Sequence, residues 1–272
     1  MDIKLIAIDI DGTLVNSKGQ LTSKVKETIK QATAQGIKVV ICTGRPLAGV
    51  TDLLAQLDLA DQDDQYVVCF GGAVVETTSG KLIFQKKISY DDFVDLEAIA
   101  RKLNLHFQAI NTERIYTCNK DIGYYTLYEA NLVSMPISYR TPEEMREIPL
   151  IKAMYIEDAE ILDPAIAKQE YFEPVKDRLD LMKTAPFYYE AYAKDVNKGN
   201  ALVKLCEILD LTADNVMAIG DEENDISMLK FAGTGVAMGN AVPAVKEVAT
   251  HHTVDNDHDG VAQAILELAL KK

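Results

Sequence analysis

Two aspartates, Asp9 and Asp11, follow an aliphatic run near the N-terminus in the stretch IAIDIDGTL (residues 6–14). Residues two apart in a β-strand point to the same face, so the two carboxylates would lie side by side if the strand extended through both. Like charges so close repel each other. The pair therefore indicates a bound cation, or two carboxylates that have different roles.

Further polar segments follow apolar runs elsewhere in the chain. TGR (residues 43–45) follows IKVVIC, and GDEEND (residues 220–225) follows NVMAI. Lys198 opens a predicted helix that leads into this late strand. Because chemistry in an open parallel sheet gathers at the carboxyl ends of the strands, we expect these segments to meet at one edge of a sheet.

The elements that would position these residues alternate between apolar strands and amphipathic helices. The predicted strands are residues 4–10, 37–43, 65–70, 215–219 and 234–238. The predicted helices are residues 22–35, 46–58, 198–210, 225–231, 242–248 and 261–270. Strands that are apolar on both faces and alternate with helices are typical of a parallel sheet covered by helices. The pattern predicts an α/β fold with a doubly wound parallel sheet.

The middle of the chain differs from both ends in composition and in the pattern of its predicted elements. Most of the tyrosines and prolines lie there, among looser strands and amphipathic helices near residues 91–103 and 122–131. We interpret this region as an inserted α+β domain. The predicted division is residues 1–82 for the first part of the core, 83–187 for the insertion and 188–272 for the second part of the core.

Composition excludes several classes of partner. The formal charge of −14 argues against nucleic acid or an anionic membrane, because a basic surface is needed to hold phosphate-rich partners. No apolar run reaches about 18 residues, and the N-terminus lacks the pattern of a signal peptide, so we expect a cytoplasmic protein. Four cysteines lie far apart without metal-ligand spacing, which predicts free thiols in a reducing compartment.

The order of these motifs is similar to that of a known family. DIDGT, then TGR, NKGNAL, GDEENDISML and AMGNAVPAVKEVA resemble the haloacid dehalogenase superfamily, specifically the Cof-type sugar phosphatases with a large cap inserted in mid-chain. The resemblance covers residues 4–75 and 190–262 by motif, and the region between them by length and style. It implies a Rossmann-like core and an inserted α+β cap that closes over the site and selects the substrate.

The resemblance also implies roles for individual residues, and phosphoryl transfer requires such roles. Asp9 is the expected nucleophile, and Asp11 would protonate the leaving alcohol and then deprotonate the attacking water. Mg²⁺ is the expected cofactor, because it suits a site made of oxygen ligands. Its implied ligands are Asp9, the Asp11 backbone carbonyl and Asp221, and Asp225 would orient a metal-bound water or ligate through it.

The remaining predicted residues would contact the phosphoryl group. Thr43 offers a hydroxyl and Lys198 a positive charge. Asn224 would donate an amide hydrogen bond, and Gly12 and Gly44 would let backbone N–H groups approach the phosphate. Singly, each of these residues also fits an ordinary turn or helix start.

A second acidic segment, DNDHDG (residues 255–260), matches the opening of an EF-hand calcium loop. Such a loop needs a glutamate at position 266, but this residue is Leu266. We therefore expect an acidic turn that caps the last helix. His251, His252 and His258 lie nearby without the usual zinc spacing, and we interpret them as loop or strand-end residues.

The sequence departs from the Cof-type pattern at two positions. Gly71 stands where an asparagine close to the site is usual, so a polar contact to substrate or phosphate is in doubt. Asp195 replaces a common glycine at a turn position, which aspartate tolerates better than most residues.

The sequence thus predicts a Mg²⁺-dependent phosphatase that hydrolyses a small phosphorylated metabolite, most plausibly a sugar phosphate, through an aspartyl-phosphate. Two alternatives remain at this point. One is a phosphotransferase or mutase that passes the phosphoryl group to a second alcohol. The other is a regulatory domain in which a partner phosphorylates Asp9.

Overall fold

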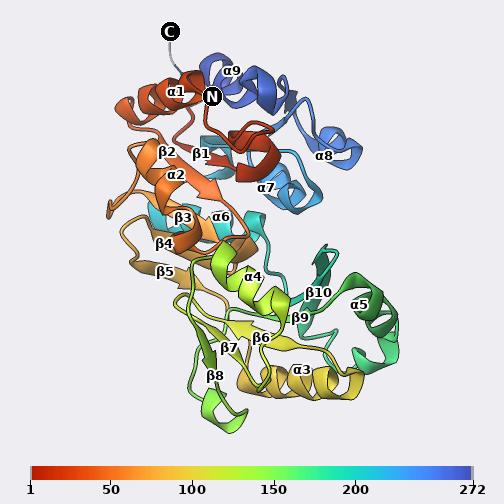
Figure 1. Ribbon diagram of the computed structural model, residues 1–272. Coiled ribbons are helices and arrows are strands. Elements are labelled where there is room, and N and C mark those ends of the chain that lie inside the picture. The colour runs from red at the N-terminus through yellow and green to blue at the C-terminus, as the bar shows by residue number, and fades with distance from the viewer. Residues whose placement is uncertain (1, 271–272) are drawn as a thin grey trace. The chain divides into compact units, whose positions relative to one another are not determined.

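The computed structural model describes residues 2–270, and they form two compact units. The first unit contains the chain up to Phe84 and again from Asn197 onward, and the second contains Gln85–Val196. Figure 1 shows that the first unit combines the two ends of the chain, drawn in red to orange and in cyan to blue. This is a core with an inserted domain, the arrangement that the sequence predicts.

The first unit is built on an eight-stranded sheet in the order β14-β13-β12-β1-β2-β3-β4-β5. Its strands are β1 (Leu5–Ile8), β2 (Lys38–Cys42), β3 (Tyr66–Cys69), β4 (Val74–Thr77), β5 (Leu82–Gln85), β12 (Val216–Gly220), β13 (Thr234–Ala237) and β14 (His251–His252). The strands from β14 to β3 are parallel, and β4 runs antiparallel to β3. The chain moves outward from β1 in both directions, so the strand order reverses beside β1. A crevice at the carboxyl ends of the strands is expected at such a point.

Six α-helices accompany the sheet of this unit within the described residues. Four of them connect parallel strands: α1 (Ser23–Ala34), α2 (Thr51–Gln56), α7 (Ile226–Phe231) and α8 (Pro243–Val248). Helix α6 (Lys198–Leu209) precedes β12, and α9 (Gly260–Leu268) follows β14. Local chemistry sets their ends: the Thr22 hydroxyl accepts a hydrogen bond from the backbone of Val25 at the start of α1 (3.2 Å). Helix α1 packs with α9, and α6 packs with α7. The α/β fold class predicted from the sequence is confirmed.

The second unit is built on a six-stranded sheet in the order β10-β11-β9-β6-β7-β8. Its elements are α3 (Tyr90–Leu103), β6 (Phe107–Ile110), β7 (Ile115–Thr117), α4 (Tyr124–Leu132), β8 (Ile137–Tyr139), β9 (Lys152–Ile156), α5 (Ala159–Ile166), β10 (Leu179–Ala185) and β11 (Tyr188–Ala193). Phe93, Leu96, Phe107, Tyr155 and Phe172 lie at the centre of its separate hydrophobic core.

The division between the units differs from the predicted one at its second junction. Strand β11 pairs with both β9 and β10, so the inserted unit continues to Val196 and does not end at residue 187. The sequence reading missed β10 and β11 because their tyrosines and alternating polar residues lack the apolar run of a core strand. Tyr188 and Glu190 consequently lie inside a sheet.

A buried ionic cluster lies on the sheet of the second unit. Lys152 on β9 contacts Glu190 on β11 at 2.7 Å and approaches Glu129 on α4 at 3.9 Å. Tyr188 donates a hydrogen bond to Glu129 (2.8 Å), and Tyr192 donates one to Glu190 (2.9 Å). Burial acts to lower the pKa of Lys152, but Glu190, Tyr192 and Glu129 outweigh it, so the pKa lies above its ordinary value. The cluster therefore depends on its ammonium.

We expect Lys152→Met to destabilise the second unit by about 3 kcal/mol, because it leaves two carboxylates buried without their cation. Native-state hydrogen exchange of the β9 and β11 amides measures this loss. The matched control is Lys176→Met, which breaks an ion pair whose two side chains are each 55% exposed. It should leave the stability of the second unit nearly unchanged, because exposed ion pairs contribute little. Equal effects of the two substitutions would contradict the assigned role of the cluster.

Candidate active site

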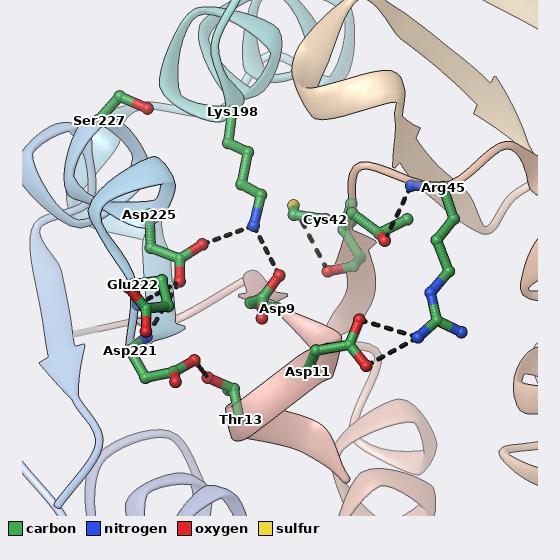
Figure 2. Close-up of polar contacts among 12 residues, drawn as sticks. Asp9, Asp11, Thr13, Cys42, Arg45, Lys198, Asp221, Glu222, Asp225 and Ser227 are labelled. Carbon is green, nitrogen blue, oxygen red and sulfur yellow. Dashed lines mark hydrogen bonds and ion pairs between the residues drawn. The ribbon is translucent and has the colours of Figure 1, made fainter. Parts of the chain in front are cut away.

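The first strand ends before its two aspartates are reached. Strand β1 stops at Ile8, and the chain then turns sharply through Gly12, whose φ is +81°. The turn buries Asp9 and leaves the Asp11 side chain 67% exposed. Figure 2 shows the two carboxylates pointing to different partners. The condition for side-by-side carboxylates is therefore not met, because the strand ends before Asp9.

Lys198 joins two of the predicted site residues. Its ammonium donates to Asp9 Oδ1 and to Asp225 Oδ1, each at 2.6 Å, and its side chain is 1% exposed. The side chain of Asn197 caps the start of α6 by accepting from the Asn200 backbone (2.8 Å). The start of α6 lies close to the turn after β3. Only a glycine fits at position 72 of that turn, since a Cβ there would lie 2.2 Å from the Asn197 carbonyl oxygen. A carboxylate from each end of the chain is thus held on one ammonium.

Asp221 is held by a separate set of donors. The Thr13 hydroxyl donates to its Oδ1 at 2.7 Å, and the Asn240 amide donates to its Oδ2 at 3.2 Å. Asn240 also donates to the backbone carbonyl of Gly12 at 2.8 Å. A Cβ at Gly12 would lie 2.2 Å from Asp221 Oδ2, so only glycine permits this packing.

Asp225 orders the turn after β12. Its Oδ2 accepts from the backbone N–H groups of Asp221 (3.0 Å) and Glu222 (3.1 Å), and its Oδ1 contacts Lys198. A Cβ at Gly220 would lie 2.5 Å from Asp225 Cβ, which explains the glycine in GDEEND. Asp225 therefore links Asp221 to Lys198.

The charges of this group do not balance. One carboxylate oxygen from each of Asp9, Asp221 and Asp225 lies within 4.8 Å of the others, and all three residues are buried. Burial raises the pKa of Asp9 to about 7, although Lys198 opposes the shift. Burial also raises the pKa of Asp221 to about 6, against the hydrogen bond from Thr13. With three carboxylates and one ammonium, the fully ionised group carries two excess negative charges, which a divalent cation would neutralise.

Thr43 lies at the end of the neighbouring strand, β2. It is 2% exposed, and its hydroxyl accepts from the backbone N–H of Arg45 at 3.1 Å. The N–H of Gly71 donates to the Thr43 carbonyl at 2.9 Å, which ties the turn after β3 to the turn after β2. Gly71 has a φ of +65°, a conformation that asparagine also tolerates.

The structure brings Asp9, Lys198, Asp221 and Asp225 together, as the convergence argument predicts. Gly44 is exposed and follows Thr43 in sequence, and Asn224 is exposed and precedes Asp225. Sequence reasoning assigned no role to Thr13, Arg45 or Asn240. Thr13 and Arg45 fall inside the quoted motifs DGT and TGR, so a signal was present. Asn240 likewise falls inside the quoted motif AMGNAVPAVKEVA, although its contact with Asp221 becomes visible only in the fold.

The second acidic segment forms a different structure. Asp255 accepts from the backbone of Asp257 (3.1 Å), and Asp257 accepts from the backbone of Ser17 (2.9 Å). Asp259 accepts from the Thr22 hydroxyl (2.5 Å). These carboxylates bind protein donors and connect two loops, and Asp255 caps a short 3-10 turn, not the last helix. Within residues 2–270, the group of Asp9, Asp221 and Asp225 is the one cluster with metal-ligand proximity.

Comparisons with known proteins place the chain in a class. The model of the haloacid dehalogenase-like hydrolase family matches residues 6–265. A Streptococcus pyogenes protein that carries a provisional phosphatase name is 44% identical over 272 residues, which cover 99% of this chain and 100% of the relative. A Bacillus subtilis protein named 5-amino-6-(5-phospho-D-ribitylamino)uracil phosphatase is 33% identical over 268 residues, which cover 97% of this chain and 95% of the relative.

Solved structures agree with this class. A haloacid dehalogenase-like hydrolase from Bacteroides thetaiotaomicron is 31% identical, with a TM-score of 0.85, and the match covers 98% of this chain and 100% of that one. The family and these relatives are those of a phosphatase that acts on a phosphorylated substrate. The chain belongs to the haloacid dehalogenase-like hydrolase family, and its resemblance to the Cof-type members is confirmed. No helix in the described chain is both long and apolar enough to cross a membrane.

We expect Lys198→Met to destabilise the metal-free protein by about 3–5 kcal/mol, since Asp9 and Asp225 lose their shared buried cation. Urea denaturation in the presence of a chelator, followed by circular dichroism, measures the loss. Lys204→Met is the control, because the ion pair of Lys204 with Glu207 is about half exposed, and its effect should stay below about 1 kcal/mol. A Lys198 variant as stable as this control would refute the electrostatic account.

Proposed function

We propose that the protein is a Mg²⁺-dependent phosphomonoesterase that hydrolyses a sugar or polyol phosphate through an aspartyl-phosphate on Asp9. The observation that carries this proposal is the buried group of Asp9, Asp221 and Asp225 around Lys198 at the carboxyl ends of β1 and β12. A strand-end carboxylate fixed by a buried ammonium suits nucleophilic attack on phosphorus, because its direction is set before substrate arrives.

The donor set fits Mg²⁺. All three side chains offer carboxylate oxygens, the ligand type that Mg²⁺ prefers, and the two excess negative charges match a divalent ion. We propose Asp9, Asp221, the Asp11 backbone carbonyl and Asp225 as the residues that hold it, the last directly or by orienting a water. When bound, Mg²⁺ would neutralise charge on the phosphoryl oxygens and on Asp9 as the two approach.

The remaining residues bind the phosphoryl group and move a proton. The Thr43 hydroxyl and the Lys198 ammonium would contact phosphoryl oxygens, together with the Asn224 amide and the backbone at Gly12 and Gly44. Asp11 is exposed beside this group, so its carboxyl is available to a leaving alcohol and then to water. We propose that it acts first as the acid and then as the base.

A sugar or polyol phosphate is the substrate class that we propose. The Bacillus subtilis relative is named for a compound that carries a phosphoribityl chain. The leaving group of such a compound is a polyol alcohol, which needs protonation as it departs, and this requirement matches an Asp11 acid. We also propose that the second unit contributes substrate selection and that the protein works in the cytoplasm, where its four cysteines remain free thiols.

Phosphate release from a panel of sugar, polyol, nucleotide and vitamin phosphates tests the function. We expect release from sugar or polyol phosphates with Mg²⁺, and at least a thousandfold loss in Asp9→Asn, roughly the cost of removing a nucleophile. Product analysis distinguishes hydrolysis from transfer to a second alcohol. Full activity in Asp9→Asn would refute the nucleophile, and no release from any compound would refute the phosphatase assignment.

Metal dependence is tested by a substitution next to the ligands. Thr13→Val removes the hydroxyl that orients Asp221, so we expect about 10-fold weaker Mg²⁺ binding with the core fold retained. The readout is the melting temperature against Mg²⁺ concentration, with the activity titration beside it. Thr33→Val is the control, because the Thr33 hydroxyl bonds the Lys30 backbone at an exposed site. Unchanged Mg²⁺ affinity in Thr13→Val would contradict the proposed metal site.

A further inference from the structure

The carboxylate of Asp11 is paired with one guanidinium. Nitrogen Nη2 of Arg45 donates to Asp11 Oδ1 at 2.7 Å and to Oδ2 at 2.9 Å. Figure 2 shows the two side chains converging from separate turns. Within residues 2–270, the hydrogen bonds and ion pairs of the Asp11 side chain all go to Arg45. The two hydrogen bonds from Arg45 therefore orient this exposed carboxylate.

The backbone of Arg45 is anchored even though its side chain is 42% exposed. Its N–H donates to the buried hydroxyl of Thr43 at 3.1 Å, and its carbonyl accepts from the N–H of Phe70 at 3.2 Å. The guanidinium therefore extends from a base that is tied to the ends of both β2 and β3. Asp11, by contrast, lies in a kinked turn before Gly12.

We infer that Arg45 is a positioning residue for Asp11 in the step that releases phosphate. The inference rests on the proposed function. In that step, water oxygen forms a bond to phosphorus, its proton passes to Asp11, and the bond from phosphorus to Asp9 breaks, which restores the Asp9 carboxylate. A carboxylate has about four acceptor positions, and Arg45 occupies two of them, so positions remain for the water proton. Loss of Arg45 lets the Asp11 side chain leave this orientation.

An activated aryl phosphate separates this role from direct substrate binding. The departing nitrophenolate of p-nitrophenyl phosphate needs no acid, so phosphorylation of Asp9 does not use Asp11, whereas the later water step does. We expect Arg45→Met to lower kcat about fivefold, the upper range for an exposed ion pair, and to leave the burst rate of nitrophenolate within twofold of the parent. Arg45→Lys keeps a cation and should recover most of kcat.

The Asp11→Asn background supplies the decisive comparison. Adding Arg45→Met to Asp11→Asn should change neither the burst rate nor the slow dephosphorylation by more than twofold, because the carboxylate that Arg45 positions is already gone. Lys30→Met, which breaks an exposed pair with Asp58 in the same unit, is the control and should leave kcat unchanged.

Two results would overturn the inference. A burst slowed as much as kcat in Arg45→Met would show that Arg45 binds the substrate itself. A further loss of fivefold in the Asp11→Asn background would show that Arg45 acts independently of Asp11. Failure of the proposed function is separate from both, since it would appear as activity that survives Asp9→Asn in the parent protein.

Discussion

The ammonium of Lys198, buried between Asp9 and Asp225, is the interaction on which the active-site structure depends. An unpaired buried charge costs several kcal/mol, so neither the lysine nor the carboxylates would be stable there alone. Burial raises the pKa of Asp9 to about 7, with smaller contributions from Asp225 and Asp221, and Lys198 opposes the shift only in part. The negative charge that Lys198 leaves uncompensated is the basis of the cation site that we propose.

The fold brings these charged residues together by placing the carboxyl ends of strands from distant parts of the sequence at one edge of the sheet. Strands β1 and β12 are parallel neighbours, so Asp9 and Asp221 follow adjacent strand ends although 212 residues separate them. Close approach is possible because glycine occupies the positions where a Cβ would collide. Gly12 lies against Asp221, and Gly72 lies against the start of α6. These glycines are as necessary to the geometry as the charged residues that they admit.

Sequence reasoning was successful where a local pattern had one structural solution. Apolar runs located β1, β2, β3, β12 and β13, and the rule for parallel strands located the convergence of Asp9 and Asp221. It left open the features that depend on the direction of the chain after a strand. Asp11 turns away from Asp9 because the strand ends at Ile8, and no periodicity records that end.

The inserted unit was harder to predict for a related reason. Its strand β11 carries a charged residue, Glu190, between two tyrosines on one face, and Glu190 pairs with Lys152. In a sequence, two residues that form a buried ion pair look the same as two exposed charged residues. Strand β11 was therefore placed after the predicted boundary at residue 187 and not inside the inserted unit. Partners that lie 38 residues apart become visible only when the sheet brings them together.

The central claim is that Asp9 forms a covalent bond to the transferred phosphoryl group, and intact-mass analysis of Asp11→Asn mixed with an activated phosphate ester and Mg²⁺ tests it most directly. The account predicts a protein heavier by one phosphoryl group, with the modification mapped to the peptide that contains Asp9 and absent from the Asp9→Asn, Asp11→Asn double variant. An unmodified protein that still turns over the ester, or a phosphoryl group on another residue, would contradict it.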